Sequence, residues 1–185
     1  MVLRTPPLAR ETPVVVTLCT GNAARSVMAA AMLGHWGERL GRPLCVVSTG
    51  THVVEGQPVS MRTRVALASI PELGERSVGS HRSTQLTGAH LERADLVVAM
   101  EANHVRFVRR HHPGEAARCA TLKRLCLDLR QGEEPLEDRV ASLGLAGLVL
   151  DPIEDVVDPA GADLEVYVAC AAELWSLTEQ LVRRL

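Results

Sequence analysis

The sequence predicts an α/β fold, with a four-stranded parallel sheet flanked by helices on both faces, and three observations support this. Residues 14–18 are an apolar, mostly β-branched run, which is typical of a strand buried on both faces. Apolar residues then recur at every fourth position over residues 26–40, which is helical spacing. A second apolar run, at residues 95–100, is again followed by a helical pattern. Because strands alternate with helices, we expect a parallel sheet wound with right-handed crossovers.

The other elements have weaker signals. Short strands are expected at residues 44–47 and around residues 119–125. Pro58 is expected to open a helix that ends near Pro71, because proline suits the first helical position. Two further helices are expected, at residues 101–111 and 163–184. The last one carries a long apolar stripe, with an acidic residue at its start and two arginines at its end, as the helix dipole favours.

The chain is long enough for one domain with a sizeable core. Prolines interrupt residues 1–12, which we expect to form a flexible tail. The domain is then expected to occupy residues 13–185. Within it, residues 131–150 read as an inserted loop or a short extra helix, since they follow neither a clear strand pattern nor a clear helical one.

The charge balance bounds the range of partners. Lys and Arg total 20 and Asp and Glu total 22, which gives a net charge of −2. This composition excludes proteins that attract nucleic acid or anionic membranes through overall positive charge. We therefore expect no nucleic acid and no membrane as a partner, and any selectivity for anions must be local.

The five cysteines form an odd set without a C-x-x-C pair, which predicts reduced thiols and a cytoplasmic location. The apolar run of residues 14–19 is too short to span a membrane. The histidines lack the spacing of metal ligands, so we expect no metal and no organic cofactor.

The segment that follows the first strand carries the chemistry. Cys19 is placed at the carboxyl end of a parallel strand, where such sheets bind ligands. Gly21 and Asn22 tolerate positive φ, so this loop can turn its N–H groups inward around an anion at the start of a helix. Arg25 can then hold two phosphoryl oxygens at once, and Ser26 can donate its hydroxyl to the sulfur. The expected phosphate-binding loop also contains Thr20, Ala23 and Ala24.

A thiolate that attacks a phosphate ester needs an acid for the leaving group and a base for water. Asp158 can supply both, because it lies in an Asp-Pro-Ala-Gly turn just before the last helix. Asp151 is a rival, since Pro152 follows it in the same way.

From about residue 14 to residue 181, the chain resembles the low molecular weight protein tyrosine phosphatase family, which includes bacterial tyrosine and arginine phosphatases. The resemblance rests on the segments CTGNAARS, STGT, GSHRSTQLT, ADLVVAM and VVDPAG in this order. It implies hydrolysis of a phosphorylated protein through a phosphocysteine intermediate. Cys19 would be the nucleophile, Arg25 the phosphate clamp, and Asp158 the general acid and base.

The same resemblance implies roles for four polar side chains around the loop. Ser26 would stabilise the thiolate, while a network would hold the loop in shape and would comprise Asn22, Ser48 and His81.

Some positions depart from the family pattern. Ala24 stands where many members have a second cysteine, so the protection of an oxidised nucleophile by a disulfide is not expected. Ala160 and Gly161 stand where an aromatic residue commonly follows the Asp-Pro pair. Ala23 occupies a position linked to the choice between tyrosine and arginine, and alanine favours neither. The resemblance implies phosphotyrosine as the substrate, with phosphoarginine as a further option, and these positions do not decide between them.

Two other functions fit the same residues. An arsenate reductase of the same fold would use the anion loop for arsenate, and Cys119 and Cys126 are then the candidate resolving cysteines. A non-catalytic module that captures phosphate groups would need the loop alone.

Overall fold

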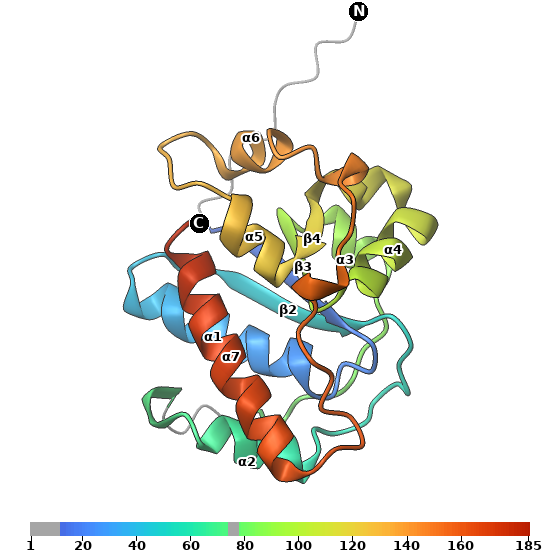
Figure 1. The fold of residues 1–185 in the computed structure, drawn as a ribbon, viewed down its shortest axis with the longest axis vertical. Helices are drawn as coiled ribbons and strands as arrows, with labels where there is room; N and C mark the ends of the chain where they lie inside the picture. Colours follow the sequence, from blue (N-terminus) through green and yellow to red (C-terminus); the bar gives the residue numbers. More distant parts are fainter. Residues whose placement is uncertain (1–11, 74–77) are drawn as a thin grey trace, which may run out of the picture.

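The computed structural model describes residues 12–73 and 78–185. The expected tail, residues 1–12, lies outside these ranges except for Thr12. A four-stranded sheet forms the centre, with strand order β2-β1-β3-β4 and parallel pairing throughout (Figure 1). Its strands are β1 (Val14–Cys19), β2 (Cys45–Gly50), β3 (Leu96–Ala99) and β4 (Cys119–Thr121). The predicted parallel α/β fold is confirmed.

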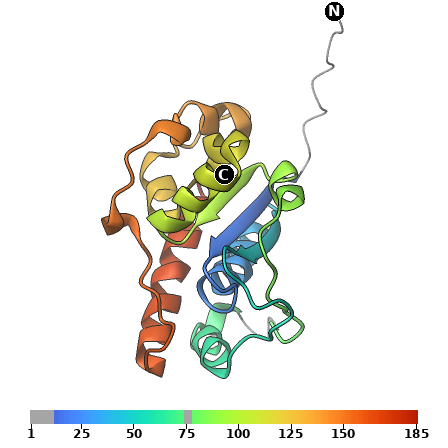
Figure 2. The ribbon, with the colours of Figure 1, turned by 90° about the vertical axis from the view of Figure 1, so that its right-hand side faces the viewer.

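Helices cover both faces of this sheet (Figures 1 and 2). Their bounds are α1 (Arg25–Arg39), α2 (Met61–Ala68), α3 (Gly88–Glu92), α4 (Ala102–His111), α5 (Leu122–Asp128), α6 (Leu136–Ala141) and α7 (Leu164–Val182). The core on one face contains buried residues of α1, α2, α5 and α7, and the core on the other contains residues of α3 and α4. Strand β1 contributes to both, since Val15 belongs to the first core and Val16 to the second. This explains the unbroken apolar run of β1, which has no polar face.

The strand order positions the site. From β1 the chain crosses first to β2 on one side and later to β3 on the other, so the carboxyl ends of β1 and β3 flank a switch point. Ligands of open α/β sheets bind at such a point. The loop after β1 and the start of α4 after β3 meet there.

Two expected element boundaries are wrong. Helix α2 begins at Met61 rather than at Pro58, because Pro58 forms an isolated β-bridge with Arg82. Ser60 caps α2 instead, since its hydroxyl accepts a hydrogen bond from the backbone N–H of Thr63. The strand expected around residues 119–125 ends at Thr121, whose side chain caps α5. Such side-chain caps are strong helix starts that an apolar pattern alone does not reveal.

The segment of residues 131–150 contains α6 and a 3-10 turn at Leu145–Gly147. Val140 and Leu145 are buried in the core of the α1 and α7 face, so the segment is part of the folded domain. That it is an insertion stays a prediction. Among the described residues, no helix has both the length and the apolar character needed to cross a membrane.

Candidate active site

The loop between β1 and α1 contains a strained residue. Asn22 has φ 50°, and no other non-glycine residue in the described ranges has a positive φ. Gly21, which also tolerates a positive φ, is not among the glycines that adopt one. Asparagine tolerates the left-handed region better than most residues, yet the conformation costs about 1–3 kcal/mol unless its surroundings hold it.

Hydrogen bonds from a distant segment hold Asn22. Its side-chain Oδ1 accepts from the backbone N–H of Thr84 at 2.8 Å. Its carbonyl oxygen accepts from His81 Nε2 at 2.8 Å and from Ser83 Oγ at 2.9 Å. The polar segment that contains His81 therefore contacts the strained loop residue through three hydrogen bonds.

The end of β2 lies directly against the loop. A Cβ on Gly50 would come within 2.5 Å of the Thr20 carbonyl oxygen and 2.9 Å of the Asn22 backbone nitrogen. The backbone N–H groups of Thr51 and His52 donate to the carbonyls of Cys19 and Thr20, each at 2.9 Å. Only a glycine at position 50 permits this close approach.

Cys19 is the last residue of β1 and is buried at the base of the loop. Its Sγ lies 3.0 Å from Ser26 Oγ. Ser26 Oγ in turn accepts a hydrogen bond from Asn22 Nδ2 at 3.0 Å, which leaves its own proton free to point at the sulfur. A negative charge on Cys19 is stabilised by such a bond and by the adjacent start of α1. Because Ala24 caps α1 without a side-chain hydrogen bond, the first N–H groups of this helix are available to an anion.

Arg25 is the first residue of α1 and is 2% exposed. Its Nη1 donates to Glu101 Oε2 at 2.7 Å and to the Val156 carbonyl at 3.0 Å. Its Nη2 lies 2.7 Å from Asp158 Oδ2. The guanidinium thus joins the loop after β1, the segment just after β3 and the loop before α7, which are far apart in sequence.

The two candidate acids differ in position. Asp158 contacts Arg25, and its side chain is 44% exposed. Asp151 is exposed and caps a short 3-10 turn, where its Oδ1 accepts from the N–H of Ile153 at 3.0 Å. Asp158 is therefore the aspartate that adjoins the arginine of the loop.

A buried histidine on α4 contacts the loop from the side. His104 Nε2 lies 3.0 Å from Thr20 Oγ1 and 3.6 Å from Glu101 Oε1. Burial, together with the nearby charge of Arg25, lowers the pKa of His104 to about 3, so the imidazole is neutral near neutral pH. Its Nδ1 is buried and has no hydrogen-bond partner among the described residues.

The structure brings most of the expected site residues together, with one exception. Ser48 lies on β2, paired across the sheet with Thr17, and lines a shallow pocket with His81. No hydrogen bond joins Ser48 to the loop within the part of the chain that the structure describes, and Thr84 and Ser83 make the contacts to Asn22 instead. Ala23 is held through its carbonyl, which accepts from Thr63 Oγ1 of α2 at 3.0 Å.

Sequence reasoning missed three residues of the site, namely Gly50, Glu101 and His104. For Glu101 a signal exists, since it follows the carboxyl end of β3 almost directly, where parallel sheets place ligand-binding residues. Among the described residues, no group of three or more histidine, cysteine or acidic side chains is placed to hold a metal ion.

Of the other cysteines, Cys170 on α7 lies near the site, since the charges of Arg25 and Asp158 act on its thiol. All five are free, and Cys119, Cys126 and Cys170 are buried. Burial raises the pKa of Cys119 and of Cys170 to about 12 and that of Cys126 to about 11. Cys45 is exposed but lies at the amino end of β2, whereas Cys19 lies at the carboxyl end of the neighbouring β1.

Comparison with known proteins shows which family has this arrangement. Residues 14–142 match the family model "Low molecular weight phosphotyrosine protein phosphatase". A protein-arginine-phosphatase of Geobacillus stearothermophilus is 30% identical over 92% of this chain and 95% of the relative. The crystal structure of a low molecular weight protein tyrosine phosphatase from T. tengcongensis superposes with a TM-score of 0.74 at 29% identity, covering 94% of this chain and 100% of that one.

A third similar structure is a YwlE arginine phosphatase in which serine replaces the active-site cysteine and is phosphorylated. Its TM-score is 0.73 at 26% identity, with 93% of this chain and 95% of that chain covered. The family model covers more than half of the chain, and the arginine phosphatase relative covers nearly all of it. The chain therefore belongs to the low molecular weight phosphotyrosine protein phosphatase family and is a cysteine-dependent protein phosphatase.

Proposed function

We propose that Cys19 is the nucleophile that removes phosphate from phosphorylated protein residues, and that Arg25 and Asp158 complete the catalytic set. The observation that carries this proposal is the convergence on Arg25. A buried guanidinium beside a cysteine, an uncapped helix start and an aspartate is suited to bind a dianion and to cleave it. The phosphorylated serine in the YwlE variant supports a covalent intermediate at the position of Cys19.

In the first step, the Cys19 thiolate attacks phosphorus, and the bond from phosphorus to the leaving oxygen or nitrogen breaks. Asp158 donates its proton to that leaving group. The incoming phosphate takes the place of Asp158 as a partner of Arg25, and the negative phosphate favours the protonated acid. In the second step, Asp158 takes a proton from water, which attacks phosphorus and restores the thiolate, with Ser26 donating to the sulfur as it leaves.

We propose phosphoarginine as the preferred substrate, because the rings that would pack against a phosphotyrosine are scarce. Trp36 and Trp175 pack against each other with ring centroids 4.4 Å apart, and Tyr167 is buried in the core. The loop after Asp158 offers only Ala160 and Gly161. A phosphorylated guanidinium on a flexible aliphatic stem needs no such wall, and the Geobacillus stearothermophilus relative bears that activity in its name.

Phosphotyrosine is the second candidate, and Phe107 favours it. Phe107 lines the pocket beside the catalytic loop, and its ring is placed to contact the ring of a phosphotyrosine.

The test uses one peptide sequence that carries either phosphoarginine or phosphotyrosine, with release of inorganic phosphate as the readout. We expect a higher kcat/KM for phosphoarginine with the unmodified protein and loss of both activities in Cys19→Ser. Cys45→Ser is the matched control, because this exposed thiol lies at the amino ends of the strands, away from Cys19 at the carboxyl end of β1. Equal turnover by Cys19→Ser would contradict the proposal. A higher kcat/KM for phosphotyrosine would select the second candidate.

The same preparation tests the two alternatives from the sequence. A reductase that resolves its intermediate with further cysteines is disfavoured, because Cys119 and Cys126 are buried and their pKa values are raised to about 12 and about 11. Arsenate reduction by this chain would contradict the phosphatase assignment. Phosphopeptide binding without turnover would select the non-catalytic module.

We also propose that the protein acts in the cytoplasm on phosphorylated proteins. The mechanism needs Cys19 as a free thiol, and all five cysteines are free. A reducing compartment maintains that state. Fractionation of cells that express the protein would test this location.

A further inference from the structure

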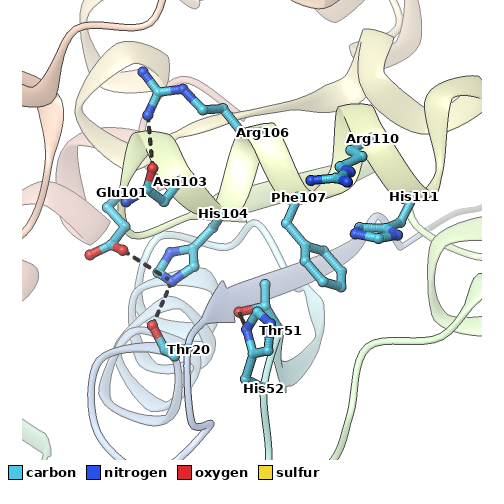
Figure 3. A pocket seen from close by; sticks show the side chains of 10 residues that line it. All are labelled: Thr20, Thr51, His52, Glu101, Asn103, His104, Arg106, Phe107, Arg110 and His111. Carbon is cyan, nitrogen blue, oxygen red and sulfur yellow. Dashed lines mark hydrogen bonds and ion pairs between the residues drawn. The ribbon is translucent and has the colours of Figure 1, made fainter.

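A pocket adjoins the catalytic loop on the side of α4 (Figure 3). Its volume is about 430 Å³, and its lining includes Thr20 of the loop and Glu101, the partner of Arg25. A substrate segment that places its phosphate in the loop therefore lies directly beside this pocket. The catalytic steps proposed above use no group of this pocket.

The charged groups of the pocket are mainly positive. Arg106 and Arg110 are exposed and lie one helical turn apart on α4, so they share one face of the helix. Arg106 donates to Asn103 Oδ1 at 2.9 Å. Arg110 has no ion-pair or hydrogen-bond partner among the described residues, and Figure 3 shows its guanidinium above Phe107. The acidic side chain of the pocket, Glu101, forms an ion pair with Arg25.

An aromatic group lies beneath these charges. The ring of Phe107 packs at 4.5 Å from His111 and at 5.6 Å from His52, measured between ring centroids, and all three line the pocket. The pocket thus has an apolar base and a rim with a free cation. This combination suits a side chain with a short apolar stem and a negatively charged end.

We propose that this pocket binds a glutamate or aspartate next to the phosphorylated residue of the protein substrate, and that Arg110 is the specificity-determining residue. The inference rests on the proposed function, since it concerns the substrate of the same site. The net charge of the chain is −2, so no overall field attracts acidic segments, and the selectivity comes from this local cation.

Binding of phosphopeptides to the Cys19→Ala protein, which has no nucleophile at this position, tests the pocket without turnover. Two peptides carry the same phosphorylated residue and either glutamates or glutamines on both sides of it. Fluorescence anisotropy is expected to give about threefold to fivefold tighter binding of the acidic peptide at low salt, as for an exposed ion pair, and a smaller preference at high salt.

Variants of Arg110 test whether the preference for the acidic peptide comes from this pocket. Arg110→Glu is expected to abolish or invert it, and Arg110→Lys to retain it. Arg39→Glu is the matched control, because it makes the same charge change at the exposed far end of α1 and is expected to keep the preference. Equal binding of both peptides, or a preference that survives Arg110→Glu, would overturn the inference. If the preference holds but the active protein hydrolyses neither peptide, the pocket assignment stands and the proposed function fails.

Discussion

The catalytic loop and the acid loop, here residues 19–26 and 157–161, meet where Arg25 of the first contacts Asp158 of the second, but the fold holds them very differently. In the catalytic loop, Asn22 and Ser26 are fully buried and Arg25 is 2% exposed. Backbone and side-chain hydrogen bonds reach this loop from β2, α2 and the segment of residues 81–84. In the acid loop, Val157 is 63% exposed and the side chain of Asp158 is 44% exposed.

Few contacts hold the acid loop in position. Val156, just before it, donates its N–H to the Met100 carbonyl at 2.8 Å, and its own carbonyl accepts from Arg25. Gly161 turns the chain with φ 79°, and Asp158 reaches the site through the ion pair with Arg25. The catalytic loop is therefore preorganised, whereas Asp158 is positioned by Arg25, the residue proposed to bind phosphate. In the proposed mechanism, substrate binding changes the contacts of Asp158 but leaves the catalytic loop in place.

Arg25→Lys is expected to have the largest effect, because it affects both loops. Lysine keeps the charge but cannot hold two phosphoryl oxygens or bridge Glu101 and Asp158 at once. We expect kcat/KM to fall about 10³-fold or more, measured by phosphate release from p-nitrophenyl phosphate. Arg39→Lys, at the other end of α1, is the control. A loss below about tenfold would mean that a point charge is sufficient.

Asp158→Asn is expected to lower kcat about 10²-fold or more on a phosphopeptide, while Asp151→Asn leaves it near the unmodified value. The amide keeps the shape of the side chain but cannot transfer a proton. Since p-nitrophenolate is a good leaving group, the loss in the first step is expected to be smaller with p-nitrophenyl phosphate. Equal losses in both variants would contradict the assignment of Asp158 and the contrast between the two loops.

The contrast also explains which parts of the site the sequence predicts. Cys19, Asn22 and Arg25 lie within one short segment, so their spacing after an apolar strand already points to an anion loop. The strands β1 and β3 are also predictable from the sequence, because a strand that is buried on both faces appears as an apolar run. Such signals are local, and local patterns are what a single sequence displays.

The missed contacts are those that depend on tertiary structure. Glu101 meets Arg25 across 76 positions of sequence, and His104 meets Thr20 across 84. The need for glycine at position 50 arises only because the loop after another strand lies against it. The predicted start of α2 is wrong for a similar reason, since Pro58 pairs with Arg82 of a distant segment.

Asn22→Ala and Asn22→Gly together measure how the catalytic loop is held. Alanine lacks both side-chain hydrogen bonds and must also adopt φ 50°, so we expect about 2 kcal/mol or more of destabilisation by urea unfolding. Glycine removes the same hydrogen bonds without the steric cost, and we expect it to destabilise by about 1 kcal/mol less than alanine does. Identical values for the two variants would show that backbone strain at this position contributes nothing to stability.

Gly161→Ala makes the corresponding change in the acid loop. Its φ of 79° is also unfavourable for alanine, and a Cβ there meets no atom within 4 Å, so we expect a cost of about 1 kcal/mol from strain alone. Because the acid loop is exposed, part of this cost can be relieved by movement of the loop. We therefore expect Gly161→Ala to reduce kcat with little loss of stability. A loss of stability as large as that of Asn22→Ala would contradict the difference in rigidity between the two loops.

The smallest expected effect comes from His104, which ties the catalytic loop to α4 through Thr20. Burial lowers the pKa of His104 from 6.5 to about 3, so between these values the unfolded chain binds a proton that the folded chain does not. Stability from this group is therefore fully present above about pH 6.5 and is lost progressively as the pH falls toward 3.

His104→Asn removes that titration while keeping a polar side chain near Thr20. Between about pH 7.5 and about pH 5.5, we expect the free energy of unfolding of the unmodified protein to fall by about 1 kcal/mol more than that of the variant. Urea unfolding at the two pH values measures the difference. Parallel losses would mean that protonated His104 is accommodated in the folded state. The catalytic loop would then be able to shift away from α4 in acid, and its rigidity would be closer to that of the acid loop than the contacts at neutral pH indicate.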